Sequence, residues 1–562
     1  MFTVLLSASA TAAEVLVEAE GFAERGGWVV DSQFISQMGS SYLLAHGLGR
    51  PVASAKTQVD LPEPGTYRVW VRTKDWVPSH HPGRFQVLVD GKPLATTFGT
   101  TGEGWIWQDG GAVEIRAHRV HVELKDLTGF DGRCDALLFT RDSRFTPPQE
   151  PDDQQAAWRR KLLGLPDVPP SAGEFDVVVV GGGIAGCSAA LTAARLGLDV
   201  ALVQNRPVLG GNAGSEINIP PAGLGGPIVD EVAGRERVEV LRAEKNVRLF
   251  LGWHAFRVQT DGNRIVGVDA KNVCTGEELR FGAPVFIDCT GDGWIGYWAG
   301  AEYRMGREAR AEFHESMAPE SADKMTHGAT LYFQVGLADE PTPFPDVPWA
   351  TEISKDHVDL RSDHRWEYGH HLDMIRDAER IRDHLLRAIY GTFATAKRRF
   401  AKAAERADLR RVDFVAARGE SRRLMGDHVL TENEIKSQGP FADAVATGSL
   451  VFCLHYPGEQ YDFRNEMKLV PVKPYPIPFR CLYSRNVENL MMAGRCASAT
   501  HIAYSSIKLM KTGGQMGRAT GAAAMLCKKH NTTPRGVYEN HIQELQDIVL
   551  GRGDYEHALK PK

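Results

Sequence analysis

Hydrophobic and polar positions alternate with a period of two over much of the first 142 residues. Such alternation predicts half-buried β-strands, and turn-forming stretches such as LPEPGTY and VDGKP separate them. The predicted strands are 15–19, 55–59, 66–73, 84–89, 112–115, 120–124 and 136–140. Several short strands at this spacing indicate an all-β jelly-roll sandwich over residues 14–142.

The pattern changes after Asp176, where four consecutive valines predict a strand buried on both faces. Gly181, Gly183 and Gly186 follow at G-x-G-x-x-G spacing and lead into an alanine-rich amphipathic helix. In dinucleotide-binding folds the first glycine permits a tight turn, the second lets a pyrophosphate approach the backbone, and the third packs helix on strand. An ordinary glycine-rich turn is the alternative interpretation.

Three later strands end at polar or glycine-rich positions. Residues 199–203 predict a strand that ends at Gln204, where most chains with this fingerprint carry Glu or Asp for the ribose hydroxyls. The Gln204 amide still has the donors and acceptor to bind a neutral diol. The other two strands, 284–288 and 489–493, are followed by Thr290, Gly291 and Asp292, and by Gly494 and Arg495.

Composition excludes several classes of function. The 562 residues suffice for two to four domains, and a net charge of −6 offers no basic surface for nucleic acid. No run approaches about 18 apolar residues, so no membrane-spanning helix is expected. The eight cysteines form no C-x-x-C pair, which argues against a structural zinc site, an iron–sulfur cluster or a redox dithiol.

Residues 1–13 resemble the remnant of a secretory signal, because a short apolar run ends in small residues before Glu14. The positively charged start of such a signal is missing. We therefore expect a periplasmic or secreted protein, with a cytoplasmic protein as the alternative. The oligomeric state is not predicted.

The loop RPVLGGNAGSE at 206–216 matches the glycine-rich loop that flavoproteins run along the pyrophosphate and ribityl chain. With the two later strand–glycine segments, it makes residues 174–530 resemble FAD-dependent oxidoreductases related to the flavin subunit of heterodisulfide reductase. Some members of that family are labelled xanthan lyases, and ESRRLMGDHVLTENEI at 420–435 is similar to the family's substrate-domain segment. The resemblance implies an α/β fold: a glutathione-reductase-like FAD-binding Rossmann domain with an inserted α+β substrate domain.

The predicted domain boundaries follow from this resemblance and from composition. A linker rich in Pro, Asp and Gln covers 143–173, and a C-terminal helical tail covers 531–562. The FAD-binding domain comprises 174–216, 281–300 and 485–530, and the substrate domain comprises 217–280 and 301–484. The residues expected to bind FAD are Gly181, Gly183, Gly186, Gln204, Arg206, Gly210, Gly211, Asn212, Thr290, Gly291, Asp292, Gly494 and Arg495.

Flavin chemistry needs a substrate C–H bond held over the ring and a base for the coupled proton. The candidate bases are His501, just after the Gly494-Arg495 turn, and His455, on a strand predicted over 449–456. Either histidine has an exposed or structural role as its alternative.

Other polar side chains are candidates for substrate binding and proton transfer. Arg422 and Arg423 would orient an anionic or polyol substrate, or they would form a buried ion pair with Glu420. Tyr504 would share a proton network, and Lys511 would polarise the flavin.

The front domain has a resemblance of its own. VEAEGF, GTYRVWVRT and CDALLFT resemble jelly-roll carbohydrate-binding modules, in which a Glu-x-Glu pair and a closing Asp hold a structural calcium ion. The resemblance carries this Ca²⁺ site to Glu18, Glu20 and Asp135, and carboxylates suit that hard cation. Trp76, Trp105 and Trp107 would form a platform for sugar rings, or they would pack as core aromatics.

The sequence therefore predicts an FAD-dependent oxidoreductase that transfers a hydride between FAD and a carbohydrate-like hydroxyl substrate, either a small molecule or an oligosaccharide. One alternative is a flavin-dependent reductase of an unsaturated or keto substrate. Two others are a secreted glycan-binding protein with a structural flavin, and an FAD-assisted redox-neutral elimination or hydrolysis.

Overall fold

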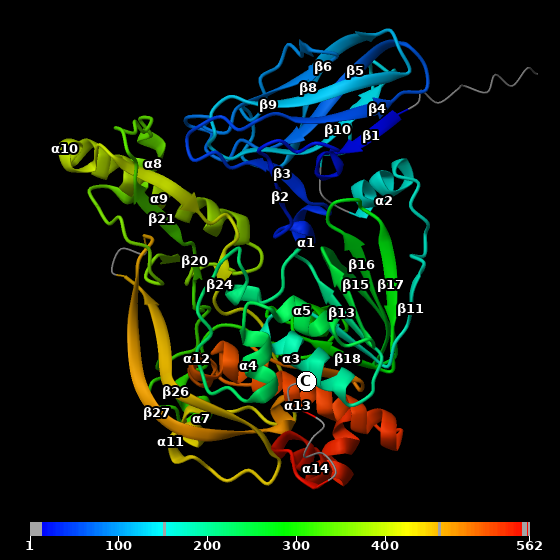
Figure 1. Cartoon of the computed structure of the whole chain (residues 1–562), viewed down its shortest axis with the longest axis vertical. Coiled ribbons are helices and arrows are strands. Elements are labelled where there is room, and N and C mark those ends of the chain that lie inside the picture. The colour runs from blue at the N-terminus through cyan, green and yellow to red at the C-terminus, as the bar shows by residue number, and fades with distance from the viewer. Residues whose placement is uncertain (1–13, 150–152, 459–461, 554–558, 560–562) are drawn as a thin grey trace, which may run out of the picture. The chain divides into compact units, whose positions relative to one another are not determined.

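The computed structural model describes residues 14–149, 153–458, 462–553 and 559, and the predicted signal remnant 1–13 lies outside them. The chain forms two compact units (Figure 1). The first unit comprises residues 1–167 and 274–276, and the second comprises 168–273 and 277–562.

Two antiparallel sheets make up the first unit. The larger contains β1 (Glu14–Glu18), β2 (Val29–Asp31), β3 (Tyr42–Ala45), β5 (Gly65–Thr73), β8 (Ile106–Ile115) and β10 (Gly132–Thr140). The smaller has the order β4 (Ala55–Asp60), β9 (Arg119–Asp126), β6 (Phe85–Val89) and β7 (Lys92–Pro93). One hydrophobic cluster includes Val69 and Leu137 of the first sheet and Val87 and Val122 of the second, so the two sheets enclose a common core.

The seven strands predicted in this unit are present, while β2, β3 and β7 were not predicted. The alternating pattern missed β3 because all four of its residues are buried, and β2 and β7 because they have only three and two residues. Short elements (α1, Ile35–Met38; η1, Ala19–Gly21) join the strands, and the predicted linker contains α2 (Asp153–Leu162).

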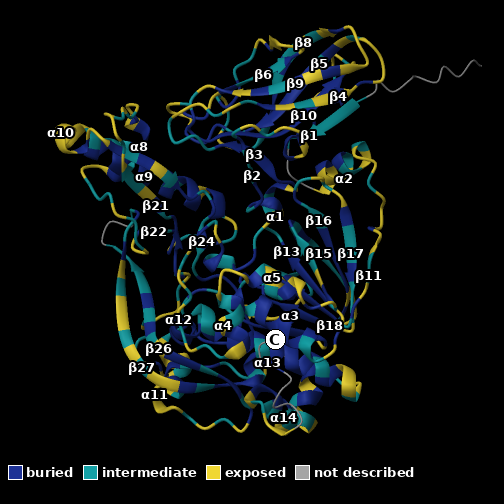
Figure 2. Cartoon of the chain, in the orientation of Figure 1, coloured by how far each residue is buried: buried dark blue, intermediate teal, exposed yellow. Residues whose placement is uncertain are grey.

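A five-stranded parallel sheet organises the second unit. Its order is β14 (Val247–Leu251), β13 (Val200–Gln204), β12 (Val177–Val180), β18 (Val285–Asp288) and β28 (Leu490–Met492). The four valines of β12 pair in register with Val200–Val203 on one side and Val285–Asp288 on the other, and all four are buried. The neighbouring strands β13 and β18 are buried along their whole length as well (Figure 2). The strand β14 lies within residues 217–280, yet it pairs with β13 at the edge of this sheet.

Helix α3 (Ile184–Arg195) follows β12 and packs against α13 (Met510–His530). A Cβ at Gly517 or Gly521 of α13 would overlap the carbonyl oxygen of Ala185 or Ala189 of α3. The alanine- and glycine-rich composition of both helices therefore allows their backbones to approach closely.

A second sheet of this unit has the order β11 (Ser171–Glu174), β17 (Glu278–Gly282), β16 (Arg264–Asn272) and β15 (Trp253–Asp261). The unit also contains α4 (Pro227–Ala233), α5 (Arg237–Arg242), α6 (Trp294–Trp298), α12 (His501–Ile507), α14 (Pro534–Leu550), η2 (Gly211–Ala213) and η3 (Phe479–Cys481).

Residues 301–484 contain both strands and helices. The strands are β19 (Tyr303–Arg304), β20 (Ala329–Thr330), β21 (Phe333–Leu337), β22 (Glu367–Tyr368), β23 (Ala407–Val412), β24 (Ala417–Arg418), β25 (Arg423–Leu424), β26 (Ala444–Pro457) and β27 (Asn465–Pro478). The helices are α7 (Arg310–Phe313), α8 (Pro348–Ser354), α9 (Ala378–Arg399), α10 (Ala401–Ala404) and α11 (Glu432–Ser437). Within the described ranges, no helix is both long enough and apolar enough to cross a membrane.

Candidate functional site

The loop between β12 and α3 is built from glycines in three different environments. Gly181 has φ +103°, and a Cβ there would overlap the Cys289 carbonyl. A Cβ at Gly186 would overlap the Gly181 carbonyl, so this position requires glycine for packing. A Cβ at Gly183 would meet only Gly211 Cα, 3.9 Å away, which leaves the second glycine facing open space.

The second glycine-rich segment lies against this loop. Gly210 N donates to Gly182 O at 2.7 Å, and Gly210 and Gly183 form a parallel bridge. Buried Gln204 accepts from Gly182 N at 2.8 Å and donates to Val208 O at 3.0 Å. Gln204 therefore fixes both loops, and its contact with a ribose stays a prediction. Of the other expected residues here, Arg206 pairs with Glu216 at 3.0 Å, and Asn212 donates to Arg418 O at 3.4 Å.

The turn after β18 brings a buried carboxylate to the same edge of the parallel sheet. Asp292 pairs with Arg418 at 2.7 Å, accepts from Ser421 Oγ at 2.7 Å, and lies 3.6 Å from Arg495. Burial raises the pKa of Asp292, but the charges of Arg418 and Arg495 outweigh it and leave the pKa below its usual value. Asp292 is thus an ionised group within a positively charged surround.

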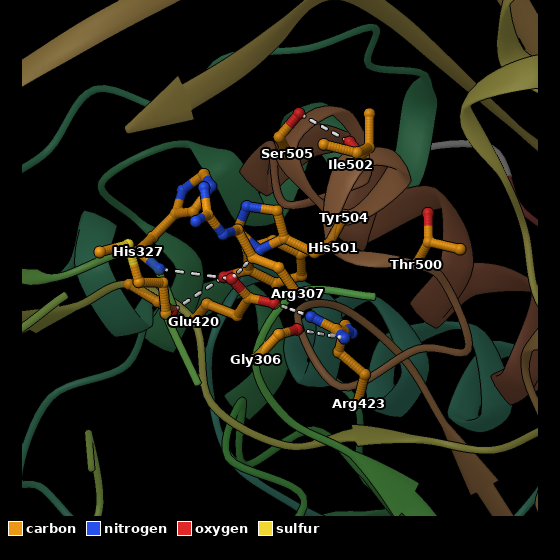
Figure 3. Close-up of polar contacts among 12 residues, drawn as sticks. Gly306, Arg307, His327, Glu420, Arg423, Thr500, His501, Ile502, Tyr504 and Ser505 are labelled. Atoms are coloured by element: carbon orange, nitrogen blue, oxygen red, sulfur yellow. Dashed lines mark hydrogen bonds and ion pairs between the residues drawn. The ribbon is translucent and has the colours of Figure 1, made fainter. Parts of the chain in front are cut away.

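His501 is the first residue of α12, and Thr500 caps that helix by accepting a hydrogen bond from Ala503 N. The His501 Nδ1 lies 2.7 Å from Glu420 Oε2, with both side chains buried (Figure 3). Glu420 also pairs with the Arg423 guanidinium. The carboxylate is therefore held between an imidazole and a guanidinium.

A second histidine, His327, lies beside His501. Their ring centroids are 5.2 Å apart, and His327 Nδ1 is 2.7 Å from Lys508 Nζ. One ring nitrogen of each histidine and one Glu420 oxygen lie within 4.8 Å of one another. Among the described residues, neither His327 Nε2 nor His501 Nε2 has a hydrogen-bond partner.

Both imidazoles are held neutral. Burial lowers the pKa of His501 well below its usual value, and the charges of Arg423 and Arg307 act in the same direction. Burial likewise lowers the pKa of His327 well below its usual value, with Lys508 adding to the effect. Each side chain is therefore available as a proton acceptor or donor without a net charge.

His455, the other predicted base, belongs to the same cluster. It lies on β26, stacks on His327 with ring centroids 4.8 Å apart, and places its Nδ1 2.6 Å from Glu367 Oε2. Burial lowers the pKa of His455, but the carboxylate of Glu367 outweighs it and the pKa lies above its usual value. Of the three histidines, His455 is thus the one whose surroundings favour the protonated form.

The carbonyl of Gly419 connects the histidines to the dinucleotide loops. It accepts a 2.8 Å hydrogen bond from Tyr504 Oη and another from the Arg495 guanidinium. Arg495 packs directly against Gly291. Of the predicted residues, His501, His455, Tyr504 and Arg495 therefore lie in one connected site.

Arg422, Arg423 and Lys511 have other surroundings. The Arg422 guanidinium stacks on Tyr297 at 3.8 Å and on Trp294 at 4.5 Å. Arg423 forms the buried ion pair with Glu420 that was the alternative to substrate binding. The Lys511 Nζ lies 2.9 Å from Asp230 of α4, while Lys508, three residues earlier and just after the end of α12, contacts His327.

Three residues of the cluster were not found from the sequence: His327, Glu367 and Lys508. Each comes from a different segment, and none stands in a recognisable motif. The sequence suggests Glu420 only as an ion-pair partner, although Glu420 is the first residue of the segment at 420–435 that resembles the family's substrate domain. The three tryptophans predicted as a sugar platform have different surroundings. Trp76 and Trp107 are buried, whereas Trp105 packs on Tyr42 with ring centroids 4.7 Å apart.

Comparison with known proteins assigns the second unit. A model of the FAD dependent oxidoreductase family matches residues 176–238 and 222–549. The chain belongs to this family. The oxidoreductase is 28% identical over 100 residues to the FAD-dependent monooxygenase asqG of Emericella nidulans, a match that covers 18% of the chain and 16% of the relative.

Other similarities cover parts of the chain. The tRNA uridine 5-carboxymethylaminomethyl modification enzyme MnmG of Prochlorococcus marinus is 38% identical over 100 residues, covering 16% of the oxidoreductase and 14% of MnmG. The matches thus span about a sixth of the length of these curated relatives. A geranylgeranyl bacteriochlorophyll reductase-like structure from Thermoplasma acidophilum covers 66% of the chain and 83% of its own (12% identity, TM-score 0.29). A family 35 carbohydrate binding module from Clostridium thermocellum covers 23% of the chain and 98% of its own (17% identity, TM-score 0.20).

The oxidoreductase is an FAD-dependent enzyme, and the loops described above fit that cofactor. Gly183 lies at the N-terminus of α3. No protein atom crowds the position that a Cβ of Gly183 would occupy, so there is space beside its backbone. There the first backbone N–H groups of a helix lack intrahelical partners and attract a pyrophosphate. The residues that would hold FAD there are Gly183, Gly210, Gly211, Gly291, Asp292, Gly494 and Arg495.

Proposed function

We propose that the oxidoreductase passes a hydride between FAD and a hydroxyl-bearing, carbohydrate-like substrate, with the reacting hydroxyl bound between His501 and His327. The observation that carries the proposal is the pair of buried Nε2 atoms that have no hydrogen-bond partner among the described residues. A buried polar atom without a partner is costly. A substrate hydroxyl would satisfy both nitrogens at once.

The neighbours of the two rings assign them complementary roles. Glu420 accepts a hydrogen bond from His501 Nδ1, which leaves Nε2 of that ring as an acceptor. Lys508 donates to His327 Nδ1, which leaves the His327 proton on Nε2 as a donor. One acceptor and one donor suit an alcohol whose oxygen loses its proton as it becomes a carbonyl.

Oxidation of such an alcohol needs little more from the protein. FAD, when bound, supplies the hydride acceptor. His501 Nε2 takes the hydroxyl proton as the adjacent C–H bond breaks, and Glu420 stabilises the imidazolium that forms. The His327 Nε2–H group donates to the oxygen that becomes the carbonyl. Both groups are shielded from water by burial, which strengthens these interactions.

The carbohydrate part of the proposal rests on a different observation. The first unit is built of strands, and its sequence segments resemble those of carbohydrate-binding modules. A module of that kind would bring the enzyme to glycans, from which a sugar hydroxyl would enter the site. This is support by association, because fold alone does not assign a substrate.

Anaerobic mixing of the holoenzyme with a panel of sugars and polyols tests the proposal. We expect bleaching of the flavin absorbance band by at least one compound, at a rate that saturates with its concentration. Absence of bleaching by every hydroxyl compound would contradict alcohol oxidation.

The other hypotheses give different results in the same apparatus. If the enzyme reduces unsaturated or keto substrates, the chemically reduced flavin is reoxidised by such compounds while alcohols leave the oxidised flavin unchanged. A redox-neutral elimination or hydrolysis forms product without any change in the flavin. A structural flavin in a glycan-binding protein gives binding without turnover.

A further inference from the structure

A cluster of three carboxylates lies in the first unit, which contains none of the residues proposed for catalysis. Glu18 ends β1, Glu20 lies in η1, and Asp135 lies on β10. One oxygen from each lies within 4.8 Å of the others. These are the residues for which the resemblance to carbohydrate-binding modules implied calcium.

Two arginines already form ion pairs with carboxylates of this cluster. Arg159 of α2 places Nη1 2.9 Å from Asp135 Oδ2 and also pairs with Glu18. Arg72 of β5 places its Nη1 2.7 Å from the same Asp135 oxygen. Arg72, Arg159 and Asp135 are all buried. Glu18 and Asp135, two of the three carboxylates expected to bind calcium, therefore each have a guanidinium partner.

The third carboxylate is Glu20. Among the described residues, Glu20 Oε2 has no hydrogen-bond partner. Burial raises the pKa of Glu20 well above its usual value, and the charges of Glu18 and Asp135 raise it further. Burial thus disfavours a third negative charge, and the carboxylates of Glu18 and Asp135 face the two guanidinium groups without a metal ion.

The arrangement does not fit calcium. That ion takes about six to eight oxygen ligands at roughly 2.3–2.6 Å, whereas the oxygens of Asp135 accept from Ser40, Arg72 and Arg159. A calcium ion at Asp135 would have to displace a buried arginine.

We propose that Arg159 occupies the place of the cation in this domain, so that a side chain of the linker helix replaces calcium and holds α2 on the sheet. Apolar contacts accompany the ion pair. Trp158 packs on Trp107 with ring centroids 6.1 Å apart, and Leu162 packs on the same cluster of Trp70 and Leu138. The helix is thus seated by a charged anchor in the middle and by hydrophobic contacts beside it.

Calcium titration of the full-length holoenzyme, after removal of metal with a chelator, tests this proposal. We expect the wild-type protein to give no binding heat with Ca²⁺ that depends on this cluster and no rise in its melting temperature at millimolar Ca²⁺. Calcium binding by the wild type that the Asp135→Asn variant abolishes would overturn the proposal.

Arg159→Ala gives the complementary test. Removing the guanidinium leaves the carboxylates facing one another, so we expect the melting temperature to fall by several degrees and millimolar Ca²⁺ to restore most of it. Arg160→Ala is the matched control, because it removes the same charge from the same helix at a side chain bonded to Pro166 O rather than to the cluster. It should gain no response to Ca²⁺.

A second substitution covers the case in which Arg159→Ala does not fold. Arg159→Gln keeps a polar side chain of similar length while removing the charge, and it should also acquire calcium binding. A folded Arg159 variant that neither binds Ca²⁺ nor melts at a higher temperature with Ca²⁺ would show that this arginine does not occupy a cation site.

Discussion

His501 and Glu420 form a buried imidazole–carboxylate pair. The carboxylate accepts a hydrogen bond from Nδ1 of the ring, which leaves Nε2 as a hydrogen-bond acceptor. His327 differs in one contact, since Lys508 rather than a carboxylate faces its Nδ1. Two side chains of the same type therefore gain opposite hydrogen-bonding roles. At the residue scale, the group that contacts the Nδ1 atom of each ring determines whether the Nε2 atom of that ring accepts or donates a hydrogen bond.

The His501→Gln variant tests the role of this ring. Since the variant lacks the proton acceptor, we expect flavin reduction by the best substrate of the sugar panel to slow by about 10²–10⁴-fold. The spectrum of bound FAD should be unchanged. Stopped-flow absorbance under anaerobic conditions measures the rate, and His121→Gln, at an exposed position on β9, is the control. Reduction of His501→Gln at the wild-type rate would rule out His501 as the base.

At the scale of elements, β12, its glycine loop and α3 are the segment that would hold the pyrophosphate of FAD. Gly186 is required by packing within the chain, because a Cβ there would overlap the Gly181 carbonyl. Gly183 has an ordinary φ of −68° and no atom of the protein close to its missing Cβ. The two glycines of one motif are thus needed for different reasons.

Alanine substitutions separate these reasons. Gly186→Ala overpacks the loop, so we expect the unfolding free energy of the apoprotein to fall by about 1–3 kcal/mol. Gly183→Ala should leave the melting temperature of the apoprotein unchanged while weakening FAD binding by about tenfold or more, equivalent to ~1.4 kcal/mol. Thermal unfolding and flavin-fluorescence titration measure the two effects. Equal FAD affinity in Gly183→Ala and wild type would place the pyrophosphate elsewhere.

Across the whole molecule, burial or partial burial lowers the pKa of several histidines. Burial lowers the pKa of His254 to about 3 and that of His384 to about 4. His327 and His501 have pKa values well below the usual one for the same reason. In the unfolded chain each imidazole would take up a proton below about pH 6.5.

Acidification should therefore destabilise the protein. Below about pH 6.5 the unfolded state binds protons that the folded state excludes, so the unfolding free energy falls as pH falls. For His384 this fall continues down to about pH 4 and amounts to roughly 2 kcal/mol at about pH 5. Glu315 opposes the trend, because burial raises its pKa to about 7 and the folded state gains a proton there.

Denaturant unfolding measured at about pH 7 and about pH 5 checks this expectation. The midpoint should be lower at the acidic pH, and the difference should shrink in His384→Gln, which has lost one of the titrating groups. A midpoint that is independent of pH in the wild type would contradict the prediction.

Patterns local in the sequence led to the correct elements. The four valines of β12 and the alternating runs of the first unit predicted strands because burial on one or both faces dictates which side chains a strand carries. The same rule missed β3, whose four buried residues show no alternation. It also could not place β14, since pairing with β13 depends on the order in which strands join the sheet.

The sequence by itself determined the cofactor and the loops that fit it, because the glycines and strands of a dinucleotide fold are close together along the chain. The tertiary structure alone decided what surrounds the histidines. His327, Glu420, His455 and His501 meet only when distant segments pack, and burial then sets their proton states. Likewise, the acidic motif of Glu18 and Glu20 suggested a metal ion. Arg159, which pairs with Glu18, lies on a helix more than a hundred residues later in the chain, and only folding brings the two side chains together.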